Sequence, residues 1–344
     1  MKKLMIITPG FPKGEADSYT IPFLGHLLPA FSERYPDVEL TVVACQKPVS
    51  AQYFWNGIRV ITLNGNDIRY PAKIRFLLKS YFRLRNIIKE EKFTGILNLW
   101  YNDFAVLSDF LPCNNFTWML GQDVRASNRY LRIKKPKSQK LISISPFSDA
   151  VLEETAGIRA HKMIPIAVDP NLFPDLNTAE RPIDIFGAGW LTPLKNYKLF
   201  LKVVLELQAQ FPNIRAEIAG TGPEGESLQA FVKQHRLEPN IKFCGLISHE
   251  ETLDKMNQSK IFLHTSTFEG GATVYAESLF SGCQLVGTLP LMDRPIKNFH
   301  CVDQKKAIAA TIADLLKETP QAERIVYYPM EYVCDKIYKL YFQE

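Results

Sequence analysis

Short apolar runs that alternate with longer amphipathic stretches are the feature that most constrains the fold of this chain. The runs are continuously apolar, which is typical of strands buried on both faces of a sheet. The stretches between them have helical spacing, so the pattern predicts βαβ units and parallel sheets, that is, an α/β protein. The predicted strands are Leu4–Thr8, Glu39–Ala44, Arg59–Leu63, Gly95–Leu99, Asn115–Met119, Lys140–Ile144 and Lys162–Pro165 in a first series, and Ile183–Phe186, Ile214–Ala219, Ile241–Cys244, Lys260–Leu263 and Gln284–Thr288 in a second series.

The break between the two series predicts two domains. A chain of 344 residues is long enough for two, at roughly 100–200 residues per domain. The segment Asp169–Pro182 is rich in turn-forming residues and separates the series. We therefore expect one domain over residues 1–170 and another over residues 171–329. The amphipathic stretch Met330–Tyr341 predicts a last helix, and we expect residues 330–344 to join the first domain.

The composition favours a cytoplasmic globular protein. The first apolar run, Leu4–Ile7, is shorter than the ~7–15 residues of a signal-peptide core and fits a buried strand better. No stretch approaches the ~20 apolar residues of a membrane span. The six cysteines form no C-x-x-C pair, so we expect mostly buried thiols in a reducing compartment rather than disulfides or a metal site.

Positive charge gathers in one segment, from Arg69 to Lys92. It holds eight basic residues and two acids, whereas the whole chain has a formal net charge of only +5. Apolar residues interleave with the cations, so one interpretation is a basic amphipathic helix that binds an anionic membrane surface, with the protein peripheral on the inner face of the membrane. The alternative is a helix packed on the sheet with a solvated basic face. No nucleic-acid-reading motif accompanies the charge, so we expect no nucleic acid partner.

A turn between a predicted strand and a predicted helix carries the strongest chemical signal. The pair Gly270-Gly271 follows the strand, and a helix pattern begins near Thr273. The free N–H groups and the dipole at such a helix start bind phosphate well. Glu269 lies at the end of the strand, and Glu277, about one turn into the helix, can reach a ribose hydroxyl. The alternative is a surface turn with two solvated glutamates.

The two glutamates belong to a larger set of motifs. Glu269 and Glu277, with seven residues between them, resemble the E-x7-E motif of the retaining glycosyltransferase family 4, among the group 1 glycosyltransferases. Four further segments resemble motifs of that family in the family's order: Ile164–Asp169 with Phe173, Phe186–Asn196, Ile218–Pro223 and Phe243–Ile247. The resemblance covers Lys162 to about Thr288 well and the first half loosely. It implies the GT-B fold, in which two Rossmann-like parallel-sheet domains face a central cleft.

The resemblance also implies roles for individual residues. Lys195 would hold the donor diphosphate, as a compact cation can. Glu269 would contact the transferred sugar, and Glu277 would take the ribose hydroxyls. The expected donor-binding set is completed by Gly270, Gly271, Ala272, Thr273 and Val274 around the phosphates, by Leu246 on the loop against the base, and by Trp190 and Gly220.

Two positions of this set allow other interpretations. Trp190 stands where the family usually has arginine, so the diphosphate site lacks one cation. The indole would pack on the sugar or the acceptor, or merely fill space. Gly220 lies in a tight strand-to-helix turn, which needs glycine for its backbone alone.

The first half is expected to bind the acceptor. Gly10, in the loop after the first strand, resembles the family's glycine-containing loop over the cleft. Asp123 resembles the aspartate of a G-x-D segment, and with Lys195 and Glu269 it forms the candidate catalytic set. The histidine that many members carry before this segment is absent here. The alternative for Asp123 is a helix N-cap.

By this resemblance the chain is an enzyme of surface polysaccharide or glycoconjugate synthesis. It would transfer a hexosyl unit from a nucleoside diphosphate sugar to a hydroxyl of a glycan or lipid-linked acceptor, with retention of anomeric configuration. The sequence has no DxD-type cluster of metal ligands, so we expect neither a metal nor another cofactor. The alternatives are a sugar-nucleotide epimerase and a catalytically inactive GT-B-like partner subunit, which the loss of arginine at Trp190 favours. A Rossmann dehydrogenase is disfavoured because no G-x-G-x-x-G follows the first strand.

Overall fold

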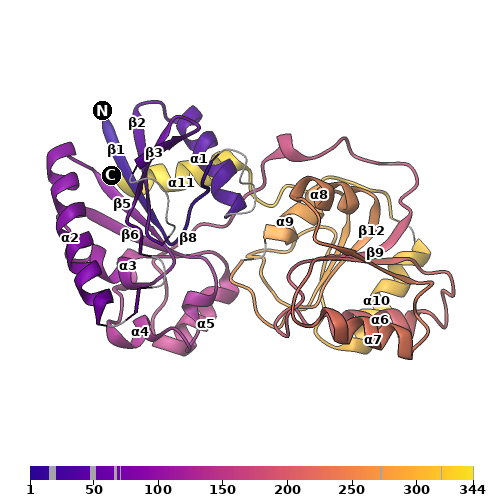
Figure 1. Cartoon of the computed structure of the whole chain (residues 1–344). Helices are drawn as coiled ribbons and strands as arrows, with labels where there is room; N and C mark the ends of the chain where they lie inside the picture. The colour runs from indigo at the N-terminus through magenta and orange to yellow at the C-terminus, as the bar shows by residue number, and fades with distance from the viewer. Residues whose placement is uncertain are drawn as a thin grey trace. The chain divides into compact units, whose positions relative to one another are not determined.

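The computed structural model describes residues 1–14, 21–46, 52–65, 68–69, 71–271, 273–318 and 320–343. The chain forms two compact units (Figure 1). Unit 1 comprises Met1–Ile166 and Met330–Glu344, and unit 2 comprises Ala167–Pro329. The first boundary lies four residues before the one expected from the sequence, and the chain returns to unit 1 at the expected residue.

Unit 1 is built on an eight-stranded sheet with the order β3-β4-β2-β1-β5-β6-β7-β8. Its parallel strands confirm the seven strands predicted for the first half: β1 (Lys2–Thr8), β2 (Val38–Ala44), β4 (Ile58–Thr62), β5 (Gly95–Leu99), β6 (Asn114–Met119), β7 (Leu141–Ser143) and β8 (Lys162–Met163). The helices of this unit are α1 (Pro22–Arg34), α2 (Ala72–Glu91), α3 (Asp103–Ser108), α4 (Arg129–Ile133), α5 (Pro146–Ala156) and α11 (Met330–Tyr341).

Strand β3 (Gln52–Trp55) departs from the predicted all-parallel arrangement. It pairs antiparallel with β4 through a tight turn at Asn56 and Gly57, whose φ angles are 45° and 75°. Positive φ at both central residues is what a type I′ hairpin turn requires, and Asn-Gly is its preferred sequence. The pair Asn56-Gly57 between an aromatic run and an apolar run is therefore the signal that predicts this hairpin.

The last helix, α11, has the bounds expected from the sequence and packs in unit 1. The ring of Tyr338 stacks on Tyr35, at the end of α1, with 4.0 Å between the centroids. Tyr341 donates its hydroxyl to a carbonyl of β5 at 2.7 Å, and its ring occupies the space that a side chain at Gly95 would need. The first sheet is thus covered by residues from the end of the chain.

Unit 2 is built on a six-stranded parallel sheet with the order β11-β10-β9-β12-β13-β14. Its strands are β9 (Ile183–Ala188), β10 (Ala216–Ala219), β11 (Ile241–Gly245), β12 (Ser259–His264), β13 (Gln284–Gly287) and β14 (Phe299–Cys301), of which β14 was not predicted. Its helices are α6 (Tyr197–Leu207), α7 (Gly225–Gln234), α8 (His249–Asn257), α9 (Thr273–Phe280) and α10 (Lys305–Glu318). Figure 1 shows α6, α7 and α10 on one face of the sheet and α8 and α9 on the other.

The strand order of unit 2 reverses beside β9. The chain continues from β9 to β10 and β11 on one side of the sheet, and then crosses to β12, β13 and β14 on the other. At such a reversal the loops after two neighbouring strands diverge to opposite faces of the sheet and leave a crevice. The loops that follow β9 and β12 therefore form the expected ligand site of this unit.

Two further expectations concern cysteines and membrane spans. Cys45, Cys283 and Cys334 are buried, but Cys113 and Cys244 are half-buried and Cys301 is exposed, so only half of the thiols lie where the sequence suggests. Within the ranges given above, no helix is long and apolar enough to cross a membrane. The same residues contain no group of three or more His, Cys, Asp or Glu side chains arranged to hold a metal ion.

Candidate functional site

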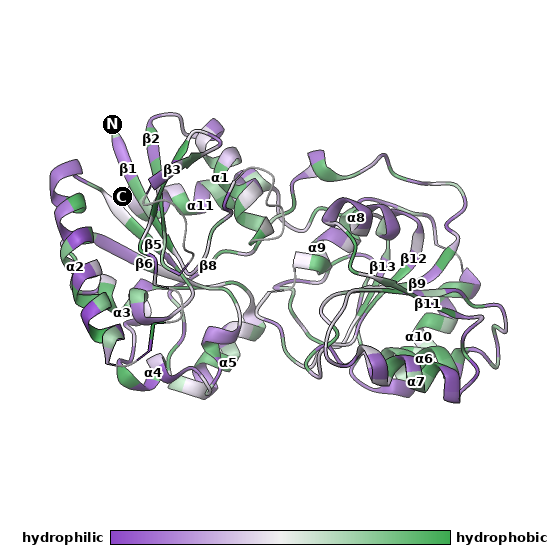
Figure 2. Cartoon of the chain, viewed as in Figure 1, coloured by the Kyte–Doolittle hydropathy of each residue, from purple (hydrophilic) through white to green (hydrophobic). Residues whose placement is uncertain are grey.

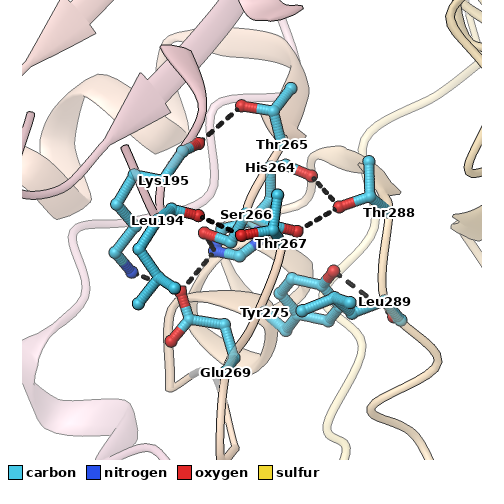
Figure 3. Close-up of polar contacts among 10 residues, drawn as sticks. All are labelled: Leu194, Lys195, His264, Thr265, Ser266, Thr267, Glu269, Tyr275, Thr288 and Leu289. Atoms are coloured by element: carbon cyan, nitrogen blue, oxygen red, sulfur yellow. Dashed lines mark hydrogen bonds and ion pairs between the residues drawn. The ribbon is translucent and has the colours of Figure 1, made fainter. Parts of the chain in front are cut away.

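Two loops at the reversal of strand order are bound to each other. Thr267, after β12, donates its N–H to the carbonyl of Leu194 at 2.8 Å and its hydroxyl to the same carbonyl at 3.2 Å. Thr265 donates its hydroxyl to the carbonyl of Lys195 at 2.9 Å (Figure 3). These bonds fix the backbone that carries Lys195 against the backbone that carries Glu269.

Lys195 and Glu269 form an ion pair at this point (Figure 3). The Lys195 ammonium binds Oε1 of Glu269, and both side chains are largely buried. His264 Nε2 lies 3.3 Å from the same oxygen. Among the residues that the structure describes, nothing binds the second carboxylate oxygen, Oε2. The site therefore anchors Glu269 by one oxygen and leaves the other free to accept a hydrogen bond.

The neighbours of Glu269 set its charge. Burial raises the pKa of this carboxyl group, but the hydrogen bond from His264 and the charge of Lys195 outweigh burial and lower the pKa to about 2. Burial also lowers the pKa of His264, and Lys195 lowers it further, against the opposing effect of Glu269. At neutral pH the site thus holds an ionised Glu269 beside an uncharged imidazole.

His264 is a member of the site that the sequence analysis did not single out. It ends β12 and is only 4% exposed. Its Nε2 lies 3.2 Å from the hydroxyl of Ser266, and its ring meets Tyr275 edge to face at 4.9 Å between centroids. Its Nδ1 is buried, and no described residue binds it. A lone polar residue that closes an apolar strand shortly before a motif glutamate is the sequence signal that points to such a partner.

Glu277 also has a histidine partner. It is the fifth residue of α9, and its Oε1 lies 2.8 Å from Nε2 of His249, the first residue of α8. This hydrogen bond raises the pKa of His249, although burial opposes the shift. Each glutamate of the E-x7-E motif is thus held at one oxygen by a histidine. No sequence signal points to His249, because it lies 28 residues before its partner and is not part of the motif.

Gly220 serves the backbone of the site. It has a φ of 135°, and a Cβ atom there would lie 1.9 Å from the carbonyl oxygen of Gly189. Its N–H donates to the carbonyl of Gly245 at 2.8 Å, so this amide is already used. The geometry fits the interpretation of Gly220 as a glycine required by the turn, rather than as a donor-binding residue.

The other expected donor residues surround the same edge of the sheet. Trp190 is 57% exposed after β9, so it does not merely fill space in the core of unit 2, and Leu246 is 68% exposed after β11. Gly270 and Gly271 precede α9. Thr273 and Val274 are the first residues of α9, whereas Ala272 lies outside the described residues.

The two expected acceptor-side residues lie in unit 1, at the carboxyl ends of β1 and β6. Gly10 follows β1 and accepts a hydrogen bond from the Thr8 hydroxyl at 2.9 Å. Asp123 is buried, and its two carboxylate oxygens accept the N–H groups of Tyr101 and Gly121, each at 2.8 Å. Burial raises the pKa of Asp123 to about 6, although these amides oppose the shift. Asp123 thus ties two loops together, which differs from the N-cap alternative.

Comparison with known proteins identifies the unit that holds the site. Residues 168–330 match the family model described as glycosyl transferases group 1. Residues 168–330 form a group 1 glycosyltransferase domain. The match includes Lys195, Glu269 and Glu277, and it confirms the resemblance to the group 1 glycosyltransferases.

Curated relatives of this group 1 glycosyltransferase domain are longer proteins. A human subunit of phosphatidylinositol N-acetylglucosaminyltransferase is 25% identical over 232 residues, which cover 62% of this chain and 48% of that protein. The UDP-N-acetylglucosamine–peptide N-acetylglucosaminyltransferase GtfA subunit of Streptococcus pneumoniae is 26% identical over 195 residues, which cover 52% of this chain and 38% of that protein. The chain spans about half or less of the length of the curated relatives it matches.

Solved structures share the fold of the whole chain. Sucrose-phosphate synthase from Thermosynechococcus elongatus has a TM-score of 0.71 at 14% identity and covers 100% of this chain and 99% of its own. Anabaena Alr3699/HepE, solved in complex with UDP and glucose, has a TM-score of 0.69 at 15% identity and covers 98% and 99%. The chain therefore has the GT-B fold, with its group 1 glycosyltransferase domain as the second of two Rossmann-like parallel-sheet domains.

Proposed function

We propose that this chain is a glycosyltransferase that moves a hexosyl unit from a nucleoside diphosphate sugar to an acceptor hydroxyl. The observation that carries the proposal is the Lys195–Glu269 pair at the reversal of strand order in a group 1 glycosyltransferase domain. A cation beside a carboxylate with one free oxygen suits a ligand that carries both a diphosphate and sugar hydroxyls.

Lys195 and the first amides of α9 are proposed to bind the donor diphosphate. The start of α9, at Thr273 and Val274, offers free N–H groups and the positive end of the helix dipole. Negative charge grows on the diphosphate as its bond to the sugar breaks, and groups fixed in advance stabilise that charge. The bond between Thr265 and the Lys195 backbone supports such a fixed arrangement. Because these groups supply the positive charge, we propose that neither a metal nor another cofactor is required.

Glu269 and Glu277 are proposed to bind hydroxyl groups of the donor. Each is held at Oε1 by a histidine, and neither Oε2 has a partner among the described residues. Oε2 of Glu269 would accept a hydroxyl of the transferred sugar, and Oε2 of Glu277 a hydroxyl of the ribose. Both carboxylates could accept without giving up an existing hydrogen bond, which favours these roles.

We propose UDP as the nucleotide and a hexose or N-acetylhexosamine as the sugar. Relatives are named for the transfer of N-acetylglucosamine. Structures of the same fold were solved with UDP. The base would lie against Leu246, and Trp190 would pack on the sugar or the acceptor, because both side chains are exposed at this edge of the sheet.

We propose that configuration is retained, as in glycosyltransferase family 4. The acceptor oxygen would bond to the anomeric carbon on the face from which the diphosphate leaves. The acceptor proton would pass to an oxygen of the departing phosphate, so that the products are the glycoside and the protonated nucleoside diphosphate. In this scheme the protein contributes position and charge stabilisation rather than a covalent nucleophile.

The acceptor is proposed to bind unit 1. Gly10 and Asp123 lie at the carboxyl edge of its sheet, where open α/β sheets bind ligands. Relatives named for phosphatidylinositol support a lipid-linked acceptor, and the peptide-modifying relative leaves a glycan or glycoconjugate as the alternative. A role in surface polysaccharide or glycoconjugate synthesis fits either acceptor.

Helix α2 is proposed to bind an anionic membrane surface, which would place the protein at the inner face of the membrane. Its Leu84 and Ile88 are buried in the core of unit 1. A second apolar line, Ile74, Leu78 and Phe82, is more than half exposed. Figure 2 shows hydrophilic and hydrophobic residues side by side along this helix. A helix that packs on the sheet with a purely solvated basic face would not need this second line.

Charge supports the same partner for α2. Arg75 and Lys79 lie exposed beside the apolar line, and neither forms an ion pair within the described residues. Lys73, in contrast, pairs with Asp103 at 2.6 Å. Free cations beside exposed apolar side chains fit an anionic lipid surface, where each cation contributes about 1 kcal/mol.

Binding to lipid vesicles tests this surface. We expect the protein to sediment with vesicles that contain phosphatidylglycerol and to remain unbound with phosphatidylcholine alone. The double variant Arg75→Glu/Lys79→Glu should weaken binding at least about tenfold, since roughly 1 kcal/mol is lost for each cation removed and repulsion is added. Lys198→Glu/Lys202→Glu on α6, with the same spacing and exposure in unit 2, is the matched control. Equal binding of both variants would exclude α2 as the membrane surface.

Thermal unfolding with nucleotides tests the donor site. We expect UDP and UDP-sugars, but not GDP or ADP, to stabilise the protein by about 2.7 kcal/mol at about 100 times the dissociation constant. The stabilisation should be the same with and without magnesium. It should be lost in Glu277→Ala, which removes the ribose partner, and kept in Glu318→Ala, an exposed glutamate of α10.

The second candidate function is a catalytically inactive GT-B-like partner subunit. It is favoured by Trp190, which stands where a cation of the diphosphate site is expected, and by relatives that are named as subunits. If no nucleotide stabilises the protein, the transferase proposal fails and this second candidate replaces it.

A further inference from the structure

We propose that His264 is a positioning residue for Glu269, which it holds by Oε1 so that Oε2 faces the sugar while Lys195 engages the donor diphosphate. The inference deepens the proposed function and rests on it. It assigns a role to a side chain that begins the segment of Glu269 and for which the sequence alone indicates no role (Figure 3).

Two side chains anchor Glu269 by the same carboxylate oxygen. The Lys195 ammonium and His264 Nε2 both bind Oε1. In the proposed reaction Lys195 must also bind phosphate, which competes with Glu269 for the same three N–H donors. A carboxylate that lost this anchor would be free to rotate unless the second anchor remained.

His264, unlike Lys195, cannot move toward the ligand. Its side chain is 4% exposed, its ring packs against Tyr275, and its backbone carbonyl accepts the N–H of Thr288 at 3.2 Å. Thr288 also donates its hydroxyl to the carbonyl of Ser266 at 2.6 Å. The imidazole is therefore fixed between the ends of two neighbouring strands.

The position of the proton on the His264 ring also favours this role. Burial lowers the pKa of His264, so the ring is uncharged near neutral pH. The tautomer with the proton on Nε2 can donate to Glu269, whereas the other tautomer would place a lone pair against the carboxylate. The buried Nδ1, which binds no described residue, needs no acceptor when it carries no proton. An uncharged donor is also not drawn toward the diphosphate.

Within the described part of the chain, few other titratable groups face Glu269. Lys195 and His264 contact it, and Tyr197 and Tyr275 sense its charge. Burial, and to a lesser degree Glu269, raise the pKa of both tyrosines, so they stay protonated and uncharged across neutral and acidic pH. A change in binding of the UDP-sugar as the pH is lowered therefore reports on Glu269 and His264.

The test compares His264→Gln, which keeps an N–H donor, with His264→Leu, which keeps bulk but has none. We expect His264→Leu to bind UDP within twofold of the wild type, measured by calorimetry. The ratio of its affinity for UDP-N-acetylglucosamine or UDP-glucose to its affinity for UDP should fall at least tenfold. His264→Gln should recover most of it. Tyr275→Phe, which keeps the ring contact, should resemble the wild type.

The pH profile separates positioning from packing. His264 lowers the pKa of Glu269, so the loss of His264 raises that pKa. When the pH is lowered, His264→Leu should therefore stop binding the UDP-sugar at a higher pH than the wild type does. His264→Gln should lose its binding of the UDP-sugar at a pH closer to that of the wild type. If both variants weaken UDP and UDP-sugar equally with an unmoved pH profile, His264 only packs and the inference is overturned. If the wild type binds neither UDP nor a UDP-sugar, the proposed function is wrong, and the inference that rests on it is wrong as well.

Discussion

Lys195→Ala is expected to reduce sugar transfer by a factor of roughly 10²–10³, which is the usual effect of removing one preorganised group that stabilises a developing anion. The loss should appear mainly in kcat, because charge on the diphosphate is greatest as the bond breaks. Transfer of radiolabelled sugar from the UDP-sugar found by thermal unfolding is the measurement. Lys198→Ala, on the exposed face of α6 three residues later, is the matched control and should transfer normally.

The same substitution also affects the free protein. Without Lys195 a largely buried Glu269 loses the one lysine or arginine that pairs with it among the described residues, so its pKa rises from about 2. A carboxyl group with a depressed pKa stabilises the fold above its unfolded-state pKa and loses this contribution as acid titrates the folded state. Lys195→Ala should therefore unfold at higher pH than the wild type. Full transfer activity in a folded Lys195→Ala protein would contradict the role of Lys195.

Gly220→Ala is expected to destabilise unit 2 by more than about 3 kcal/mol, which combines strain at a positive φ with a backbone collision. The new Cβ would lie 1.9 Å from the carbonyl oxygen of Gly189, and that atom belongs to a backbone rather than a flexible side chain. The loop after β9, which carries Lys195, would have to move away from the loop after β10. Urea unfolding followed by circular dichroism measures the loss.

Gly225→Ala is the control for this prediction. It lies five residues later, at the start of α7, where a Cβ atom would meet only the side chain of Leu191 at 3.8 Å. Alanine favours a helix over glycine by up to about 1 kcal/mol, so this variant should be as stable as the wild type or slightly more so. Equal stabilities of Gly220→Ala and Gly225→Ala would show that the turn tolerates a side chain.

The sequence predicts most of this fold because its strands are buried on both faces. A parallel strand covered by helices is apolar almost throughout, so the central strands stand out as apolar runs. The edge strands β8 and β11 are also among the twelve predicted strands, although they are only partly buried. The two that escape prediction are peripheral. Strand β3 lies at the edge of its sheet, with exposed and half-buried residues, and β14, of only three residues, is likewise not fully buried. Edge strands need not be continuously apolar, and their sequences show less contrast with loops.

The site is less predictable, because its contacts depend on strand order. Motifs point to Lys195 and Glu269 separately, but they lie 74 residues apart and meet only because β9 and β12 are neighbours in the sheet. The histidine that holds Glu277 is set by the packing of α8, which no local pattern records, whereas the local signal of the histidine that holds Glu269 is only its place at the end of an apolar strand. Gly220 shows the opposite case. Its motif is visible in the sequence, but its geometry indicates that the glycine is needed for the backbone conformation of the turn rather than for binding the donor.

The return of α11 to unit 1 has a consequence for the order in which the chain is made. All of unit 2 is synthesised before Met330, so unit 1 lacks the helix that covers Tyr35 and Gly95 until after the whole of unit 2 has been made. Domains often fold in the order of synthesis. Unit 1, whose first strands are made before unit 2, thus completes its fold with a segment made after unit 2, and the apolar surface that α11 covers stays exposed until that segment is in place.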